Sequence, residues 1–458
     1  MLTIRRLLAK SSMMNKNLKP TRIITLSFIS IILVGTILLV LPISVRDGES
    51  VNLLTAFFTA TSATCVTGLS LVDTYEHWSL FGQAIILVLI QIGGLGFMSF
   101  ISIFYFLMNR RVRLRERLVI MESMNLSSVE GVVGLVRHVL IGTLLFEVGG
   151  AVILSCCFIP EFGTAGGIWR GIFHSVSAFC NAGFDIMGKH SMFSSLETYI
   201  DNPVILITLA LLIIIGSTGF YVWEDVITSR KFKKLHVHSK LVLILTGVLI
   251  VLGMLMYLVF EGDNPNNMGD LSMGRKVLLS IFQSVSTRTT GFDVMGQFTL
   301  TEDTKALSML LMFVGGSSGS TAGGVKTVTL GIIILSVINT MRGKRDLVIF
   351  ERKIPQRQVL NAMTLVFISM MIALLGGITI SAINDANFID ALFESVAAYS
   401  TAGMTTGLIR TVNPASLLLI IFFMFFGKIG VLSLSIAFMV KSGKLVNYTY
   451  PEENVIIG

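Results

Sequence analysis

Long apolar runs constrain this chain more than any other feature. Eight of them are long enough to cross about 30 Å of hydrocarbon at about 1.5 Å per residue. They cover residues 23–42, 80–108, 132–159, 203–223, 241–260, 304–340, 359–382 and 414–440. Charged residues make up 14% of the 458 positions, against about 25% in soluble proteins. The sequence therefore predicts an all-α polytopic membrane protein with eight transmembrane helices and excludes an ordinary soluble enzyme.

Four shorter apolar segments lie between the paired runs. At about 12 residues each they are too short to cross a membrane and suit re-entrant helices. They cover residues 53–65, 168–180, 274–288 and 388–400. A stretch in or beside each runs from Phe through small and hydroxyl residues to Gly, and the Phe-to-Gly offset is 10, 10, 9 and 10. The stretches are Phe58–Gly68, Phe173–Gly183, Phe282–Gly291 and Phe393–Gly403. This pattern predicts four tandem helix–pore loop–helix repeats.

The repeated glycine loop indicates an ion pathway. Non-helical backbone is tolerated at membrane depth where protein buries it or where it lines a watery path. Four such loops can surround one axis, where their carbonyl oxygens replace the hydration shell of an ion. The negative C-terminal ends of the short helices favour a cation. Close packing of small residues between helices is the alternative, but it does not explain four copies at a near-constant period. We therefore expect four re-entrant pore helices around a central ion pore.

The distribution of charge predicts the orientation of the chain. Basic residues concentrate in both tails and in the loops near 109–117, 229–240 and 341–357, so the positive-inside rule places both termini in the cytoplasm. The net charge of +8 then reflects cytoplasmic loops rather than nucleic-acid binding. The outer face holds seventeen acidic and seven basic residues; this imbalance either concentrates cations or is merely what outer loops usually show.

The repeats divide the chain into six parts. These are an N-terminal tail at 1–22, repeats at 23–117, 118–240, 241–357 and 358–440, and a C-terminal tail at 441–458. The third repeat contains a glycine-rich loop at 315–327 that interrupts the sixth apolar run.

Several motifs together resemble the Trk/Ktr/HKT superfamily of potassium transporters. They are Phe-Cys-Asn-Ala-Gly-Phe at 179–184, Thr-Arg-Thr-Thr-Gly-Phe at 287–292 and the glycine-rich break in the sixth run. Eight runs without an added N-terminal pair, and the ending Tyr450–Gly458, favour the membrane subunit of the Ktr branch. The resemblance implies a K⁺ selectivity filter whose carbonyls bind the ion. Its residues are Val66, Thr67, Gly68, Asn181, Ala182, Gly183, Thr289, Thr290, Gly291, Thr401, Ala402 and Gly403.

The resemblance also implies that the loop at 315–327 is an intramembrane gate. Its gating residues are Gly315, Gly316, Gly319, Gly323, Gly324 and Lys326. Five glycines break the helix there. The loop does not fit a nucleotide-binding P-loop, because Val325 separates Gly324 from Lys326 and the context is helical.

Charged residues near the apolar runs are further candidates. Lys428 lies inside the eighth run, where the family commonly has an arginine that acts as a positive pore barrier; snorkelling to the surface is the alternative. We expect Arg288 to support the pore loop by donating to its carbonyls or to an acid such as Glu394. Glu147, in the third run, is interpreted as a helix-contact residue, with ion coupling as the alternative.

The resemblance implies partners as well. We expect a homodimer in the bacterial plasma membrane, in contact with lipids, on a cytosolic ring of KtrA-like RCK subunits that bind ATP or ADP. This chain itself is expected to bind no nucleotide, with K⁺ as the transported ion and Na⁺ as a candidate activator. His236 and His238 lie in a basic loop and suit solvent better than a metal ion. The sequence predicts a channel-like protein rather than an enzyme, with a K⁺/Na⁺ or K⁺/H⁺ symporter as the alternative.

Overall fold

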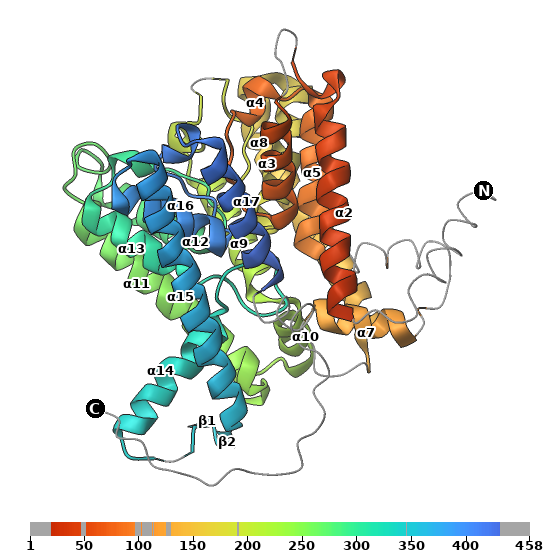
Figure 1. Ribbon diagram of the computed structural model, residues 1–458, viewed down its shortest axis with the longest axis vertical. Helices are drawn as coiled ribbons and strands as arrows, with labels where there is room; N and C mark the ends of the chain where they lie inside the picture. The colour runs from red at the N-terminus through yellow and green to blue at the C-terminus, as the bar shows by residue number, and fades with distance from the viewer. Residues whose placement is uncertain are drawn as a thin grey trace.

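The computed structural model describes residues 20–46, 52–96, 102, 112, 114–124, 130–189, 192–344 and 346–430. Over these ranges the chain is mostly helical, as expected, and Figure 1 shows α2, α3 and α5 on one flank with α11, α13, α15 and α16 on the other. The C-terminal tail lies outside the described residues, as does the N-terminal tail up to residue 19. The helices are α2 (Pro20–Val40), α3 (Leu53–Cys65), α4 (Thr74–His77), α5 (Leu80–Leu95), α7 (Leu114–Ser123), α8 (Val132–Phe179), α9 (Pro203–Thr218), α10 (Phe220–Ser229), α11 (Val237–Glu261), α12 (Met273–Thr289), α13 (Glu302–Phe313), α14 (Thr327–Met341), α15 (Gln356–Asn384), α16 (Phe388–Ser400) and α17 (Pro414–Ile429). A two-stranded hairpin pairs β1 (Val348–Ile349) with β2 (Arg352–Lys353).

Four described helices, α2, α8, α11 and α15, are long and apolar enough to cross a membrane. The bent pair α9 and α10 makes a fifth candidate. The run at 203–223 was expected to be a single straight helix, and this is wrong. The chain turns by 92° at Gly219, whose φ is +96°, so the run is divided between α9 and α10. The helix expected at 80–108 ends at Leu95, and most of its remainder lies outside the described residues. The count of eight spans therefore stays a prediction.

The short helices sit between longer ones. Within each unit the short helix packs against its flanking helices: α3 against α2 and α5, α12 against α11 and α13, and α16 against α15 and α17. In the second unit the label α8 covers two helices, because the chain turns at Gly163, whose φ is +74°, and α8 packs against α9. The two parts fold back on each other: Ser175 Oγ donates to the Glu147 carbonyl at 2.6 Å, and a Cβ added to Gly171 would meet Ser155. The expected separation of the long segment at 132–159 from the short helix at 168–180 is therefore seen in the structure.

The four units also contact one another in a cycle. The helix that follows each pore loop packs against the element that carries the next short helix: α5 on α8, α9 on α12, α13 on α16 and α17 on α3. The last contact joins the end of the described chain to its beginning. This closure directs the four loops that end the short helices toward a common centre.

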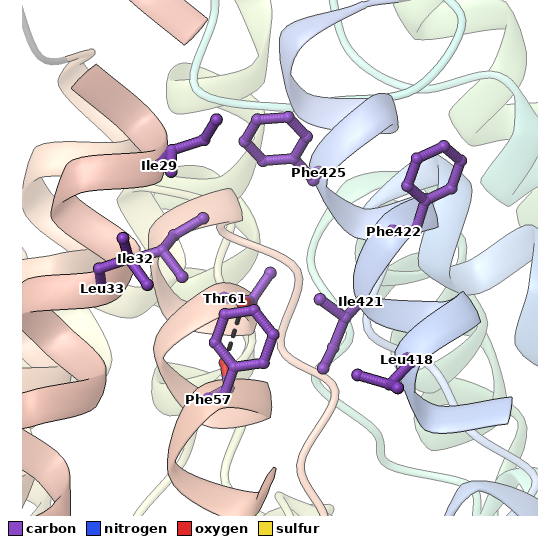
Figure 2. Close-up of a pocket in the computed structure, with 9 residues that line it drawn as sticks. All are labelled: Ile29, Ile32, Leu33, Phe57, Thr61, Leu418, Ile421, Phe422 and Phe425. Atoms are coloured by element: carbon purple, nitrogen blue, oxygen red, sulfur yellow. Dashed lines mark hydrogen bonds between the residues drawn. The ribbon is translucent and has the colours of Figure 1, made fainter. Parts of the chain in front are cut away.

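Apolar side chains cover the outer faces of the long helices. Leu33 and Ile37 on α2, Leu145 on α8 and Val259 on α11 are all more than half exposed. An apolar cavity of about 300 Å³ lies among α2, α3 and α17, where the first and last units meet (Figure 2). The hydroxyl of Thr61, the polar group in its lining, donates to the Phe57 carbonyl at 2.8 Å. Surfaces of this kind fit lipid rather than water.

Candidate ion pore and gate

The four predicted loop glycines form a closed ring of contacts. A Cβ added to Gly68 would meet the carbonyl oxygen of Ala182, and one on Gly183 would meet that of Thr290. A Cβ added to Gly291 would meet the carbonyl oxygen of Ala402. A Cβ added to Gly403 would meet the carbonyl oxygen of Thr67, which closes the ring. Each glycine therefore lies against the residue that precedes the glycine of another loop. All four glycines have φ between +69° and +98°, where a side chain is strained.

Three of the loops leave their short helix in the same way. Val66, Asn181 and Thr401 have left-handed φ values of 57°, 59° and 51°. The amide of the following residue then bonds five residues back, as in Thr67 N to Ser62 O at 2.8 Å and Ala182 N to Ser177 O at 2.7 Å. This is the Schellman end of a helix. It turns the chain directly from the pore helix into the loop.

The third loop differs, and its offset of nine residues is the cause. Helix α12 continues through Thr289, and Thr290 has φ −121° rather than a left-handed value. Both Thr290 N and Gly291 N bond to the Ser286 carbonyl, at 2.9 and 3.3 Å. One residue fewer between Phe282 and Gly291 leaves no position for the left-handed residue.

The side chain of Asn181 compensates at this loop. Its Oδ1 accepts hydrogen bonds from Thr289 Oγ1 at 2.8 Å and Thr290 Oγ1 at 3.0 Å. Its Nδ2 donates to Thr321 Oγ1 at 2.6 Å. The sequence selected Asn181 for its backbone. It did not select Thr321, which lies in the predicted gate loop among the selected glycines, 140 residues from Asn181.

The predicted gate loop lies against the ends of the pore helices. It connects α13 to α14, and Ser317 N donates to the Ser217 carbonyl at 3.0 Å. A Cβ added to Gly323 would meet the Thr401 side chain, and one on Gly324 would lie 3.2 Å from the Ser400 carbonyl oxygen. Ser400 and Thr401 lie at the end of the fourth pore helix, just before Gly403 of the predicted filter. The loop is therefore placed on the side of the ring to which the pore-helix ends point.

Two lysines donate to neighbouring carbonyls of the predicted gate loop. Lys428 Nζ donates to the carbonyl of Thr321, and Lys326 Nζ donates to that of Ala322 at 2.8 Å. The Lys428 ammonium thus points into the protein rather than snorkelling to the surface. Its role as a barrier to ions stays a prediction.

Arg288 does not pair with Glu394 as one alternative expected. The Arg288 guanidinium donates to the Gly315 carbonyl at 3.5 Å, at the start of the gate loop. Glu394 instead accepts from Thr405 Oγ1 and from Thr406 N, the latter at 3.0 Å. Glu394 therefore braces the chain that follows the fourth filter loop.

Glu147 joins two helices behind the second filter loop. Gln91 Nε2 lies 3.0 and 3.1 Å from the two carboxylate oxygens, and the carboxyl is buried. This contact fits the interpretation of Glu147 as a helix-contact residue.

The predicted loop histidine His236 pairs with an acid: its Nδ1 lies 2.9 Å from Asp225 Oδ1. No group of three or more His, Cys, Asp or Glu in the described ranges is placed to hold a metal ion.

The whole-chain comparison decides the family. A family model described as TrkH, cation transport protein, matches residues 8–448. This chain belongs to the TrkH family of cation transport proteins. The TrkH family transports cations and is not a family of enzymes.

Similar proteins cover almost the full length of this TrkH family member. The potassium/sodium uptake protein NtpJ of Enterococcus hirae is 38% identical, over 97% of this chain and 98% of NtpJ. Ktr system potassium uptake protein B of Bacillus subtilis is 36% identical, over 96% of this chain and 97% of its own. The crystal structure of the potassium transporter TrkH from Vibrio parahaemolyticus covers 93% of this chain and 86% of its own, with a TM-score of 0.71 and 16% identity. This last likeness concerns the fold alone.

Proposed function

We propose that this protein takes up K⁺ across the bacterial plasma membrane through a filter made by its four glycine loops. The observation that carries the proposal is the closed ring in which each loop glycine lies against a carbonyl of another loop. Its filter residues are the twelve named from the sequence. The names of NtpJ and of the Ktr proteins, which refer to potassium or potassium and sodium uptake, support this cargo.

The ring supplies the chemistry that a dehydrated cation needs. The carbonyls of Thr67, Ala182, Thr290 and Ala402 belong to one layer of residues, each preceding a loop glycine. Carbonyl dipoles replace lost hydration, and the C-terminal ends of the pore helices add partial negative charge. Glycine in all four loops favours K⁺ over Na⁺ as the cargo.

The gate loop and its two lysines close this path in our proposal. Two positive charges on adjacent carbonyls oppose a passing cation. A unit charge at 4 Å contributes about 4 kcal/mol at an effective dielectric constant of about 20. Transport then requires the loop and its lysines to move away from the pore-helix ends. The glycines of the loop would permit that movement.

Regulation and assembly belong to the same proposal. Two relatives are named as protein B of a Ktr system, which supports a further component, and we propose a cytosolic, nucleotide-binding RCK ring beneath a homodimer. The termini and basic loops would face that ring from the cytoplasm. Lipid chains would contact the exposed apolar helix faces. Na⁺ would act on regulation rather than as the main cargo.

Rescue of a K⁺-uptake-deficient bacterium tests the cargo. We expect the wild-type chain, expressed with a regulatory subunit, to restore growth at low K⁺, and Gly291→Ser to lose rescue or K⁺ preference. Rescue by Gly291→Ser with unchanged preference for K⁺ over Na⁺ would mean that the filter is elsewhere.

Substitution of Lys428 tests the gate. Lys428→Met removes both the charge and the bond to the loop, so we expect higher K⁺ flux without the regulatory subunit. Lys428→Arg keeps the charge and is the matched control. Equal flux in wild type and Lys428→Met would remove the barrier role.

A symporter is the second candidate, and the position of Glu147 favours it. The carboxyl is buried between α5 and α8, close to the second filter loop. Coupled transport usually needs an ionisable group within the membrane. Glu147→Gln separates the two: a channel keeps voltage-driven K⁺ flux, whereas a proton-coupled symporter loses it.

A further inference from the structure

Thr321 is held by three separate parts of the chain. Its hydroxyl lies 2.6 Å from Asn181 Nδ2 and within 3.3 Å of the carbonyls of Phe179 and Gly216. Its own carbonyl accepts the bond from Lys428. The side chain is fully buried. Any displacement of the gate loop that carries Thr321 away must break these contacts together.

Asn181 makes Thr321 a contact of the filter as well. The carboxamide donates to Thr321 at one end and accepts from Thr289 and Thr290 at the other. Both threonines precede Gly291 in the one filter loop that has no left-handed helix end. The Asn181 Nδ2 also lies 3.3 Å from the Phe179 carbonyl, a longer contact within its own loop. Loss of Thr321 would leave Asn181 with this longer donor contact alone, and rotation of the amide toward another partner would remove the acceptor from Thr289 and Thr290.

We propose that the Asn181–Thr321 hydrogen bond couples the position of the gate loop to the binding of K⁺ in the filter. With the loop in place, Asn181 is fixed and the third filter loop is preorganised for the ion. With the loop displaced, Asn181 is released and K⁺ binds less tightly. Coupling of this kind is reciprocal, so a K⁺ ion in the filter stabilises the gate loop in place. The inference rests on the proposed function and names Thr321 as a positioning residue within it.

The test uses K⁺ binding rather than flux alone. Purified full-length protein is titrated with K⁺ in Na⁺-free buffer, and protection from thermal unfolding is recorded for wild type and Thr321→Val. Valine keeps the shape and removes the hydroxyl. We expect the half-protecting K⁺ concentration to rise roughly 2- to 10-fold, the range that corresponds to one net hydrogen bond.

Two controls isolate the hydrogen bond. Thr218→Val removes a hydroxyl that donates to Ile214 within its own helix, beside the gate loop, and should titrate as wild type. Thr321→Ser keeps the hydroxyl and should also titrate as wild type. Thr321→Cys, which retains the volume with a much weaker hydrogen-bonding group, replaces valine if that variant does not fold.

The outcomes are distinct. An unchanged K⁺ titration in Thr321→Val would overturn the coupling, as would an equal shift in Thr321→Ser. If wild type itself shows neither K⁺-dependent protection nor K⁺ uptake, the proposed function fails first. If wild type shows both and Thr321→Val titrates normally, the coupling alone fails.

Discussion

The third predicted filter loop and the other three reach the same ring of glycines by different means. Loops one, two and four are set by their own backbone, through a left-handed residue and a bond back to the pore helix. The third loop has no such residue and is held by the side chain of Asn181 from the second repeat. The stretch from Phe282 to Gly291 is one residue shorter than in the other repeats. In place of a left-handed helix end, the third loop therefore has hydrogen bonds to Asn181 of the second repeat.

The second repeat also contacts the third loop after its glycine. Beyond Gly291, Asp293 N donates to Ser195 Oγ at 3.1 Å, and Leu196 N donates to the Asp293 carbonyl at 3.0 Å. The third loop is therefore clamped by second-repeat segments both before and after its glycine. Substitutions that weaken this clamp should affect the third loop more than equivalent changes affect the first.

The largest effect is expected at the contact between the second and third loops. Gly183→Ala forces a Cβ onto the Thr290 carbonyl and strains a φ of +69°. We expect K⁺ uptake to fall more than about tenfold, since a left-handed non-glycine residue alone costs about 1–2 kcal/mol. Gly247→Ala is the matched control, because its added Cβ would meet no described side chain or other segment within 4 Å beyond its own turn of α11. Wild-type uptake in Gly183→Ala would break the account of the ring.

A smaller effect separates the third loop from the first directly. Thr290→Val loses the bond to Asn181, whose Oδ1 still accepts from Thr289, so we expect a loss of about 0.5–1.5 kcal/mol in stability. Thr67→Val is the equivalent change in loop one, where the described residues offer the hydroxyl no partner. Thermal unfolding in detergent compares the two. Equal losses would show that the loops are held alike.

The smallest expected effect is a pH dependence of stability at Glu197, which follows Leu196 in the segment that contacts Asp293. Burial, and then the nearby charge of Asp293, raise the pKa of Glu197 to about 7. Because this folded-state pKa lies above the unfolded value of about 4.3, the contribution of Glu197 to the free energy of unfolding is greatest at low pH. It is lost as the pH rises toward 7. We expect the thermal midpoint of Glu197→Gln to fall less than that of wild type between pH 5 and about 7.5. Parallel midpoints across that range would contradict this.

The sequence predicts the parts of the pore better than their contacts. The Phe-to-Gly stretches identify all four short helices and loops because local composition and spacing encode them. The offset of nine at Gly291 was visible, but its consequence depends on Asn181, 108 residues away from Thr289. Likewise, Arg288 and Glu394 each found other partners than expected, because side-chain pairing across repeats depends on the three-dimensional packing of the units.

Helix bounds show the same limit. Apolar runs do not reveal where a glycine ends or bends a helix, so the turn at Gly219 and the end of α5 at Leu95 were not expected from hydropathy. Glycine is compatible with a straight membrane helix as well as with a break. At Gly219 the chain bends, and the bend is stabilised by packing against the predicted gate loop, where Phe220 N donates to the Gly319 carbonyl at 2.9 Å.

Voltage-driven flux into proteoliposomes tests the central claim most directly. The purified chain, with its regulatory subunit where needed, is reconstituted and K⁺ uptake is measured against imposed membrane potentials, with Na⁺ and H⁺ movement followed in parallel. A filter of four glycine loops predicts K⁺ uptake that follows the potential without co-movement of Na⁺ or H⁺. A fixed K⁺:Na⁺ or K⁺:H⁺ stoichiometry, or no K⁺ flux in a folded sample, would contradict the account.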